Sequence, residues 1–353
     1  MLKEKIILNN NMKKIAITGG SGFFGEYLIN FMLSKNIECL SIDINSPEKK
    51  NNKFSFEKID VCDQEKLSNS LNNIDAIFHC VANVPLAKNK KLFERTNILG
   101  TKSILDASLR KKIKKVIILS SSAVYGIPKK NPVNEQSETI PKEDYGKTKL
   151  AAEQVCFDQK YKDLDITIIR PRTIMGHGRL GIFEILFDWV SKGYNIPVLN
   201  NGKNIYQFIH AKDLAKACFI SSKLKGINLI NCGSEKYSSM YETLNNLCNH
   251  ADTGSKIKSL PLGLIEPIMN ISSFLKLSPL APYHSLMYGR SLYFDNKKIS
   301  ALGWTSEYSN DQMFRESYDW YLANKENISL SNQKSAHKNK VQQKMLKLLR
   351  YFL

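Results

Sequence analysis

Thr18-Gly-Gly-Ser-Gly-Phe-Phe-Gly25 is the stretch that decides the fold of this 353-residue chain. The residues before it, Lys14 to Thr18, are predicted to form a short buried strand, and Phe23 to Ser34 have the apolar spacing of a helix. Gly19, Gly22 and Gly25 fall at the junction, where glycine permits positive φ and lets backbone N–H groups approach a ligand. The helix N-terminus adds partial positive charge there. The stretch therefore predicts a strand–turn–helix unit that can bind a pyrophosphate.

An acidic residue at the end of the next strand indicates which dinucleotide binds. The strand ending in Leu40-Ser-Ile-Asp43 puts Asp43 18 residues beyond Gly25, where a carboxylate can accept a hydrogen bond from a ribose 2′-hydroxyl. The same carboxylate repels a 2′-phosphate, and no arginine follows it closely. We therefore predict that the cofactor is NAD rather than NADP.

Strand and helix patterns alternate through the first half of the chain. Strands are predicted at 54–58, 74–80, 115–120 and 166–170, and helices at 64–71, 92–110 and 145–161. Near-continuous apolar strands between helices indicate an α/β fold whose parallel sheet is covered on both faces. The chain is predicted to re-enter this sheet near 227–231. Its length suffices for such a sheet plus a smaller second domain.

Tyr145-Gly-Lys-Thr-Lys149 is the second informative motif. Tyr145 and Lys149 are four residues apart on a predicted helix, so they share a face. The unperturbed pKa of tyrosine is about 10, but an ammonium one turn away and a positive nicotinamide ring both favour the phenolate. Ser121, at the end of a predicted strand, can hold a substrate oxygen by a hydrogen bond. These residues predict proton transfer coupled to redox chemistry at a carbon that bears a hydroxyl or carbonyl.

These motifs, in this order, resemble the extended short-chain dehydrogenases/reductases of the NAD-dependent epimerase/dehydratase family. The resemblance covers about residues 13 to 325. It rests on Thr18–Gly25, Asp43, Asp60-Val61, His79-Cys-Val-Ala82, Asn97 with Gly100-Thr101, Ser120–Gly126, Tyr145–Lys149, Arg170-Pro171 and Phe208-Ile-His-Ala-Lys-Asp213.

The resemblance implies an α/β fold: a Rossmann-type doubly wound parallel sheet with a smaller C-terminal α/β substrate domain. It also implies that Tyr145 is the acid/base, that Ser121 is its hydroxyl partner and that Lys149 bonds the nicotinamide ribose. A homodimer is expected through the helix carrying Tyr145 and the helix at 92–110. The implied cofactor-binding residues are Gly19, Gly22, Phe23, Phe24, Gly25, Asp43, Asp60, Val61, Ala82, Asn97, Ser120, Tyr145, Lys149 and Pro171.

The resemblance, together with the residue pattern, predicts the domain boundaries. An N-terminal extension covers 1–12, and an NAD-binding domain covers 13–175 with return segments near 205–232. The substrate domain lies mainly at 176–325, and a basic amphipathic tail covers 326–353.

The branch of the family is indicated by the residues before Val124. Dehydratases resemble the pattern Thr-Asp-Glu there, whereas this chain has Ser121-Ser122-Ala123, which disfavours dehydration. The segment Pro132-Val-Asn-Glu135 resembles sugar-nucleotide epimerases. These oxidise the sugar transiently with NAD, rotate it, and return the hydride to the other face. We therefore expect an NAD-dependent sugar-nucleotide epimerase, with a nucleotide sugar as substrate.

Two positions depart from that branch. Thr173 stands where the epimerases usually have asparagine, and Tyr206 stands where they usually have an arginine that grips the diphosphate. Arg172, Arg179 and Arg290 are candidate replacements for phosphate contact, or else surface or lid charges. The candidate substrate-binding residues are Ser122, Arg172, Thr173, Arg179, Tyr206 and Arg290.

Two other functions stay open. The apolar segment 260–283 suits a lid over an apolar alcohol or ketone, as in a 3β-hydroxysteroid dehydrogenase-like oxidoreductase, or the packing of the C-terminal domain. A non-catalytic, NAD-sensing scaffold is the alternative from another class, and the intact Ser121, Tyr145 and Lys149 argue against it.

Composition narrows the partners. The net charge is +18, but the lysines are dispersed and no nucleic-acid motif appears, so we expect no nucleic acid. Seven cysteines without a C-x-x-C pair suit a reducing cytoplasm, and no histidine or cysteine cluster predicts a metal site. The tail at 326–353 holds six Lys/Arg against one Glu with apolar residues at helical spacing. It could bind the inner face of a membrane peripherally, and it could equally dock on a partner or on the protein's own body.

Overall fold

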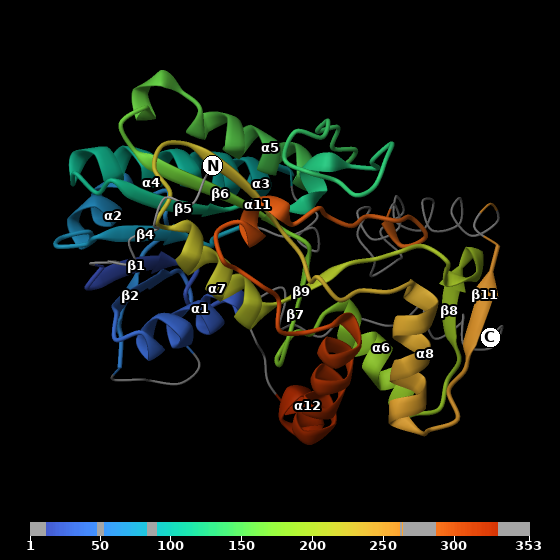
Figure 1. The fold of residues 1–353 in the computed structure, drawn as a ribbon. Helices are drawn as coiled ribbons and strands as arrows, with labels where there is room; N and C mark the ends of the chain where they lie inside the picture. The colour runs from blue at the N-terminus through green and yellow to red at the C-terminus, as the bar shows by residue number, and fades with distance from the viewer. Residues whose placement is uncertain (1–11, 48–52, 83–89, 262, 264–286, 331–353) are drawn as a thin grey trace.

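Seven parallel strands form the central sheet of the computed structural model, which describes residues 12–47, 53–82, 90–261, 263 and 287–330 (Figure 1). The strand order is β10-β6-β5-β4-β1-β2-β3, and each neighbouring pair runs parallel. The strands are β1 (Lys14–Thr18), β2 (Glu38–Asp43), β3 (Ser55–Lys58), β4 (Ala76–His79), β5 (Lys115–Leu119), β6 (Asp165–Pro171) and β10 (Asn228–Cys232).

The chain winds outward in both directions from β1 and β4. In such sheets the ligand lies at the carboxyl ends of the strands, where the winding direction reverses. The predicted doubly wound Rossmann-type sheet is therefore confirmed. The predicted return near 227–231 is β10, which pairs with β6 from Asn228 opposite Thr167 to Cys232 opposite Pro171.

Helices cover both faces of this sheet (Figure 1). On one face, α1 (Phe23–Ser34) packs with α7 (Ala211–Ser221), over Ile15 and Ile17 of β1. On the other, α2 (Gln64–Ser70), α4 (Gly100–Arg110) and α5 (Asp144–Cys156) lie over Ala16. Successive side chains of a strand point to opposite faces, so β1 contributes to both cores.

Two predicted helices differ from the structure. The helix expected over 92–110 is α3 (Lys90–Phe93), then a π-helical segment η2 (Glu94–Leu99), then α4. The helix expected over 145–161 ends at Cys156. Asp158 then accepts a hydrogen bond from Lys160 N and caps a short 3₁₀ turn, η4 (Gln159–Tyr161), so the chain leaves the helical path there.

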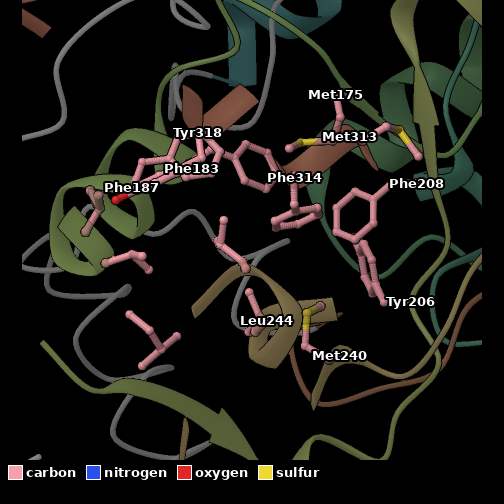
Figure 2. Close-up of a cluster of buried hydrophobic side chains, with 14 of the residues drawn as sticks. Met175, Phe183, Phe187, Tyr206, Phe208, Met240, Leu244, Met313, Phe314 and Tyr318 are labelled. Atoms are coloured by element: carbon pink, nitrogen blue, oxygen red, sulfur yellow. The ribbon is translucent and has the colours of Figure 1, made fainter. Parts of the chain in front are cut away.

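A second, smaller group of elements follows β6. It contains α6 (Ile182–Ser191), α8 (Met240–Ala251), α12 (Asn310–Leu330) and a parallel pair, β8 (Ile196–Leu199) with β11 (Ile257–Leu260). Aromatic rings fill its core. Figure 2 shows Phe314 among them, edge-on to Phe208 with ring centroids 5.0 Å apart and to Phe183 at 6.0 Å. This is the α/β substrate domain that the sequence predicts.

Short connecting elements complete the fold. A parallel pair, β7 (Thr173–Met175) with β9 (Phe208–His210), continues from β6 towards the second core. The remaining pieces are η3 (Ser122–Tyr125), η5 (Asn200–Gly202) and α11 (Lys297–Ser300).

Several predicted segments lie wholly or partly outside the described residues. These are the extension before residue 12, residues 262 and 264–283 of the apolar segment, and 331–353 of the tail. Helix α12 continues to Leu330, past the predicted domain boundary at 325. Within the described part of the chain, no helix has the length and apolar character needed to cross a membrane.

Candidate functional site

The glycine loop between β1 and α1 is built for close approach to a ligand. Gly19 has φ +74°, and a Cβ on Gly25 would lie 2.1 Å from the backbone oxygen of Gly19. No side chain caps α1 at Gly22, so the first-turn N–H groups are left to other acceptors. Ser21 Oγ, in the loop, is buried and finds no hydrogen-bond partner in the described part of the chain. These features fit the pyrophosphate of a dinucleotide.

Asp43 lies beside this loop, at the end of β2. Its Oδ2 accepts a hydrogen bond from Ser21 N at 3.2 Å, and its Oδ1 accepts one from Asn45 N at 3.0 Å. The carboxylate is thus fixed at the edge of the glycine loop, as its predicted role in binding a ribose requires.

The residues predicted near the adenine follow β3. Asp60 accepts hydrogen bonds from Cys62 N at 2.9 Å and from Arg95 at 2.6 Å. Partial burial raises the pKa of Asp60, but these bonds outweigh it and the pKa is lowered overall. Val61 is buried against Gly100, where an added Cβ would lie 3.0 Å from its Cγ2.

Asn97 connects the π-helical segment to the helix that carries the predicted catalytic tyrosine. Its side chain is buried and donates to Thr148 Oγ1 at 3.2 Å, and Thr148 Oγ1 donates to Tyr145 O at 3.0 Å. π-Helical turns occur often at functional sites. Here the irregular turn carries Asn97, whose amide reaches α5 through Thr148.

Tyr145 stands in the first turn of α5. Glu143 caps this helix by accepting hydrogen bonds from Tyr145 N at 2.8 Å and Gly146 N at 2.7 Å. The ring of Phe93 meets the Tyr145 ring edge-on, with centroids 6.3 Å apart. Burial raises the pKa of Tyr145 to about 12, although a hydrogen bond with Ser121 and the charge of Arg179 both lower it. The structure thus brings the predicted Ser121–Tyr145 pair together.

Lys149 lies one turn further along α5 and is only 4% exposed. Its Nζ donates to Leu119 O at 2.6 Å, at the carboxyl end of β5. Burial lowers the pKa of Lys149 to about 8, and the nearby Glu153 carboxylate opposes that shift. The ammonium is therefore held at the carboxyl end of β5, one helical turn after the tyrosine, as the spacing predicts.

A buried ion pair that sequence reasoning missed supports this arrangement. Arg170 donates to both carboxylate oxygens of Glu153, at 2.9 and 2.6 Å, and to Tyr125 Oη at 2.7 Å. Ser120, a predicted cofactor contact, donates its hydroxyl to Glu153, and Tyr125 donates to Asn231 Oδ1. Glu153 lies four residues after Lys149, and this spacing on one helix face is the signal that could have revealed it.

Several predicted substrate residues form one cluster. Arg172 is 1% exposed, so the alternative that it is a surface or lid charge is wrong. Its Nε donates to Gln207 O at 3.1 Å and its NH1 donates to Ser122 Oγ at 2.9 Å. The guanidinium carbon lies 4.6 Å from the ring centroid of Tyr206, whose hydroxyl is 2.9 Å from Thr173 Oγ1.

The other two arginines make different contacts. Arg179 is half-buried, with its guanidinium carbon 5.5 Å from the ring centroid of Phe23 and 5.9 Å from that of Phe183. Burial lowers the pKa of Arg179 to about 10, and the proximity of Tyr145 opposes the shift. Arg290, also half-buried, accepts a hydrogen bond at its backbone oxygen from Asn204 Nδ2 at 3.4 Å.

The remaining predicted residues stand at the same sheet edge. Ala82 follows β4, Pro171 closes β6, and Phe23 and Phe24 begin α1. Among the described residues, no group of three His, Cys, Asp or Glu side chains is arranged to hold a metal ion.

Comparison with known proteins places this geometry in a family. A family model described as "NAD dependent epimerase/dehydratase family" matches residues 15–233. The uncharacterized protein y4nG of Sinorhizobium fredii is 46% identical over 99% of this chain and 88% of its own length. The sterol-4-alpha-carboxylate 3-dehydrogenase (decarboxylating) of Mus musculus is 28% identical over 60% of this chain and 59% of its own length.

A solved structure has the same fold. UDP-glucose 4-epimerase of Thermotoga maritima, solved with UDP-glucose, superposes with a TM-score of 0.72 at 19% identity, over 88% of this chain and 99% of that one. These findings confirm the predicted resemblance, the fold class and the NAD-dependent enzyme class. The family model matches residues 15–233, and one relative is 46% identical over 99% of this chain. The chain therefore belongs to the NAD dependent epimerase/dehydratase family.

Proposed function

We propose that this protein is an NAD-dependent epimerase of a nucleotide-activated sugar. The observation that carries the proposal is the Ser121–Tyr145 pair, with the buried Lys149 one helical turn further along α5. These residues lie at the carboxyl ends of the strands, where the glycine loop also lies. The Ser-Ser-Ala sequence at 121–123 supplies no carboxylate to eliminate water. The UDP-glucose 4-epimerase of similar fold supports a nucleotide sugar and inversion at C4.

The protein residues would divide the proton chemistry among them. The glycine loop and Asp43 would hold NAD, and the nicotinamide would supply the acceptor and donor for a hydride at the sugar carbon. Ser121 holds the sugar oxygen, and Tyr145 removes the hydroxyl proton and gives it back. A phenol whose pKa is about 12 is a weak base at neutral pH, so its phenolate must be favoured by the charge of Arg179, which lowers the pKa of Tyr145, and by the positive nicotinamide ring of the cofactor.

A second candidate is the oxidation or reduction of an apolar alcohol or ketone. The 28% identity to a sterol-4-alpha-carboxylate 3-dehydrogenase favours it. The two functions differ in how they use the cofactor, because an epimerase regenerates NAD in each turnover and a net dehydrogenase must exchange it.

The test is to denature the purified protein and measure the nucleotide that it releases. Release of about one NAD per chain supports the epimerase, since its cofactor is recycled in place. A protein that is purified empty, binds NAD reversibly and oxidises an apolar alcohol would contradict it.

We also propose a homodimer through α4, α5 and the segments beside them. Large apolar side chains are exposed there: Leu99 at 53%, Phe157 at 52% and Leu92 at 37%. Burying such side chains on a partner removes apolar surface from water. Leu99→Glu is therefore expected to produce monomers, measured as a halved mass by light scattering after size exclusion. Leu322→Glu, at an exposed position on α12, is the control and should leave the mass unchanged.

The basic tail is proposed to bring a cytoplasmic enzyme to the inner face of the membrane. Apolar residues recur in its sequence at helical spacing, and lysine and arginine fill the other face of the helix, as in membrane-surface helices. The full chain is expected to sediment with anionic liposomes but not with neutral ones. Removal of residues 331–353 is expected to abolish the sedimentation with anionic liposomes. Equal pelleting of the full and shortened chains would rule out this role for the tail.

A further inference from the structure

Arg172 is a buried cation whose charge the protein does not balance within the described part of the chain. Both of its hydrogen-bond acceptors there, Gln207 O and Ser122 Oγ, are neutral oxygens. Its NH2 is buried and has no hydrogen-bond partner among the residues that the structure describes. A buried charge without a counter-charge is costly, and so is a buried N–H group without an acceptor.

The arginine two residues earlier shows the usual solution. Arg170 lies in β6, two residues before Arg172, is equally enclosed, and faces both oxygens of the Glu153 carboxylate. Arg172 instead lies against two rings, with its guanidinium carbon 4.6 Å from the Tyr206 centroid and 5.7 Å from that of Phe294. The rings hold the guanidinium plane but supply no full negative charge.

The position of Arg172 indicates where the missing anion belongs. Its NH1 bonds Ser122, which follows Ser121, the residue proposed to hold the reacting sugar oxygen. An anion that meets NH2 would therefore be held next to the Ser122 side chain, one residue along the chain from the proposed sugar contact. In a hexose that reacts at C4, the carboxylate of a uronic acid is attached to the adjacent carbon, C5.

We propose that Arg172 recognises a carboxylate on the sugar, so that the substrate is a nucleotide-linked uronic acid. The inference rests on the proposed epimerase function and narrows its substrate class. A guanidinium pairs with a carboxylate through two parallel N–H···O bonds, and Arg172 has NH2 and the second hydrogen of NH1 for them. Phe294, which also lies against the guanidinium, limits the access of water, and this strengthens such a pair.

Access requires a side chain to move. Tyr206 covers the guanidinium, and its hydroxyl is held by Thr173 Oγ1. Figure 2 shows Tyr206 beside Phe208 at the edge of the aromatic cluster. A ligand therefore reaches the guanidinium only if this ring rotates away from it and gives up its contact with Thr173.

The experiment measures binding to the full-length, NAD-loaded protein by titration calorimetry. The probes are UDP-glucuronic acid and UDP-glucose, which differ in the carboxylate at C6. The wild-type protein is expected to bind the acid about tenfold more tightly or better, as a charge-assisted hydrogen bond provides. Arg172→Met is expected to lose that preference and to keep its affinity for UDP-glucose. Arg315→Met, which removes an exposed arginine paired with Asp311 on α12, is the matched control and should behave as the wild type.

Other results would overturn the inference in different ways. If Arg172→Met weakens both sugars equally, Arg172 holds the diphosphate that they share. If the wild type prefers neither sugar, no carboxylate is recognised, although the epimerase proposal survives. If neither sugar binds the wild type, a UDP-linked uronic acid is not the ligand and the inference fails, whereas the epimerase proposal is decided separately by the release of NAD. The preference of the wild type can be measured without any variant, and Arg172→Lys, which keeps the charge but not the two-pronged geometry, is expected to give an intermediate preference.

Discussion

Tyr145→Phe is expected to lower kcat by a factor of about 10² to 10⁴, which is the usual contribution of a positioned acid or base. The substitution removes only the hydroxyl that pairs with Ser121, and the ring keeps its edge contact with Phe93. The fold and the bound NAD should therefore remain. The measurements are turnover of the nucleotide sugar and the NAD released on denaturation.

Tyr161→Phe is the matched control for that substitution. The Tyr161 hydroxyl donates to Asp106 at 2.8 Å, on the face of the sheet covered by α4 and α5 and within the core there. Its loss should cost about 1 kcal/mol of stability and leave turnover unchanged. A Tyr145→Phe protein as active as the Tyr161→Phe protein would remove Tyr145 from the chemistry. A wild type without turnover on any nucleotide sugar or alcohol would revive the alternative of an NAD-sensing scaffold.

Arg170→Met is expected to destabilise the protein by about 3–5 kcal/mol, the cost of leaving one partner of a buried ion pair alone. The Glu153 side chain is 2% exposed and would keep its charge without a cation on either oxygen. Tyr125 would also lose the Arg170 donor. The measurement is the free energy of unfolding from urea denaturation, followed by two independent probes.

Two comparisons test that explanation. In the double variant Arg170→Met/Glu153→Leu, both charges are gone, so most of the lost stability should return. Arg172→Met should cost far less than Arg170→Met, because it leaves no carboxylate behind. Equal losses for the two arginine variants would show that packing, rather than the uncompensated Glu153 charge, determines the effect.

The first half of the fold could be predicted from local signals. The observed bounds of β1 and α1 are those predicted, because a buried apolar strand, three glycines and a helical apolar period agree with one another there. The early end of α5 could not be predicted, since Asp158 and the following turn compete with a helix that the sequence could continue. The pairs β7–β9 and β8–β11 are three or four residues long and join segments far apart in sequence, such as Thr173 opposite Phe208. Pairing between such distant segments cannot be predicted from local periodicity.

The site divides in the same way. Motif spacing identified Ser121, Tyr145 and Lys149, because those residues lie at fixed positions on one strand end and one helix. Motif spacing could not show that Arg170 and Arg172 have different partners. The two arginines are two residues apart at the end of β6, and only the fold shows that Glu153 meets Arg170 and that Ser122 meets Arg172. Glu143 was missed because a glutamate at a helix N-cap carries no distinctive sequence signal.

The central claim is that the protein inverts a sugar carbon by removing a hydride and returning the same one. The most direct test uses UDP-glucuronic acid and UDP-glucose labelled with deuterium at C4, incubated with the purified protein without added NAD. Proton NMR and mass spectrometry then follow the product. The account predicts a C4 epimer that retains the deuterium, because the hydride never leaves the site. Inversion with loss of the deuterium to water, or accumulation of a ketone with an equivalent of reduced cofactor, would contradict it.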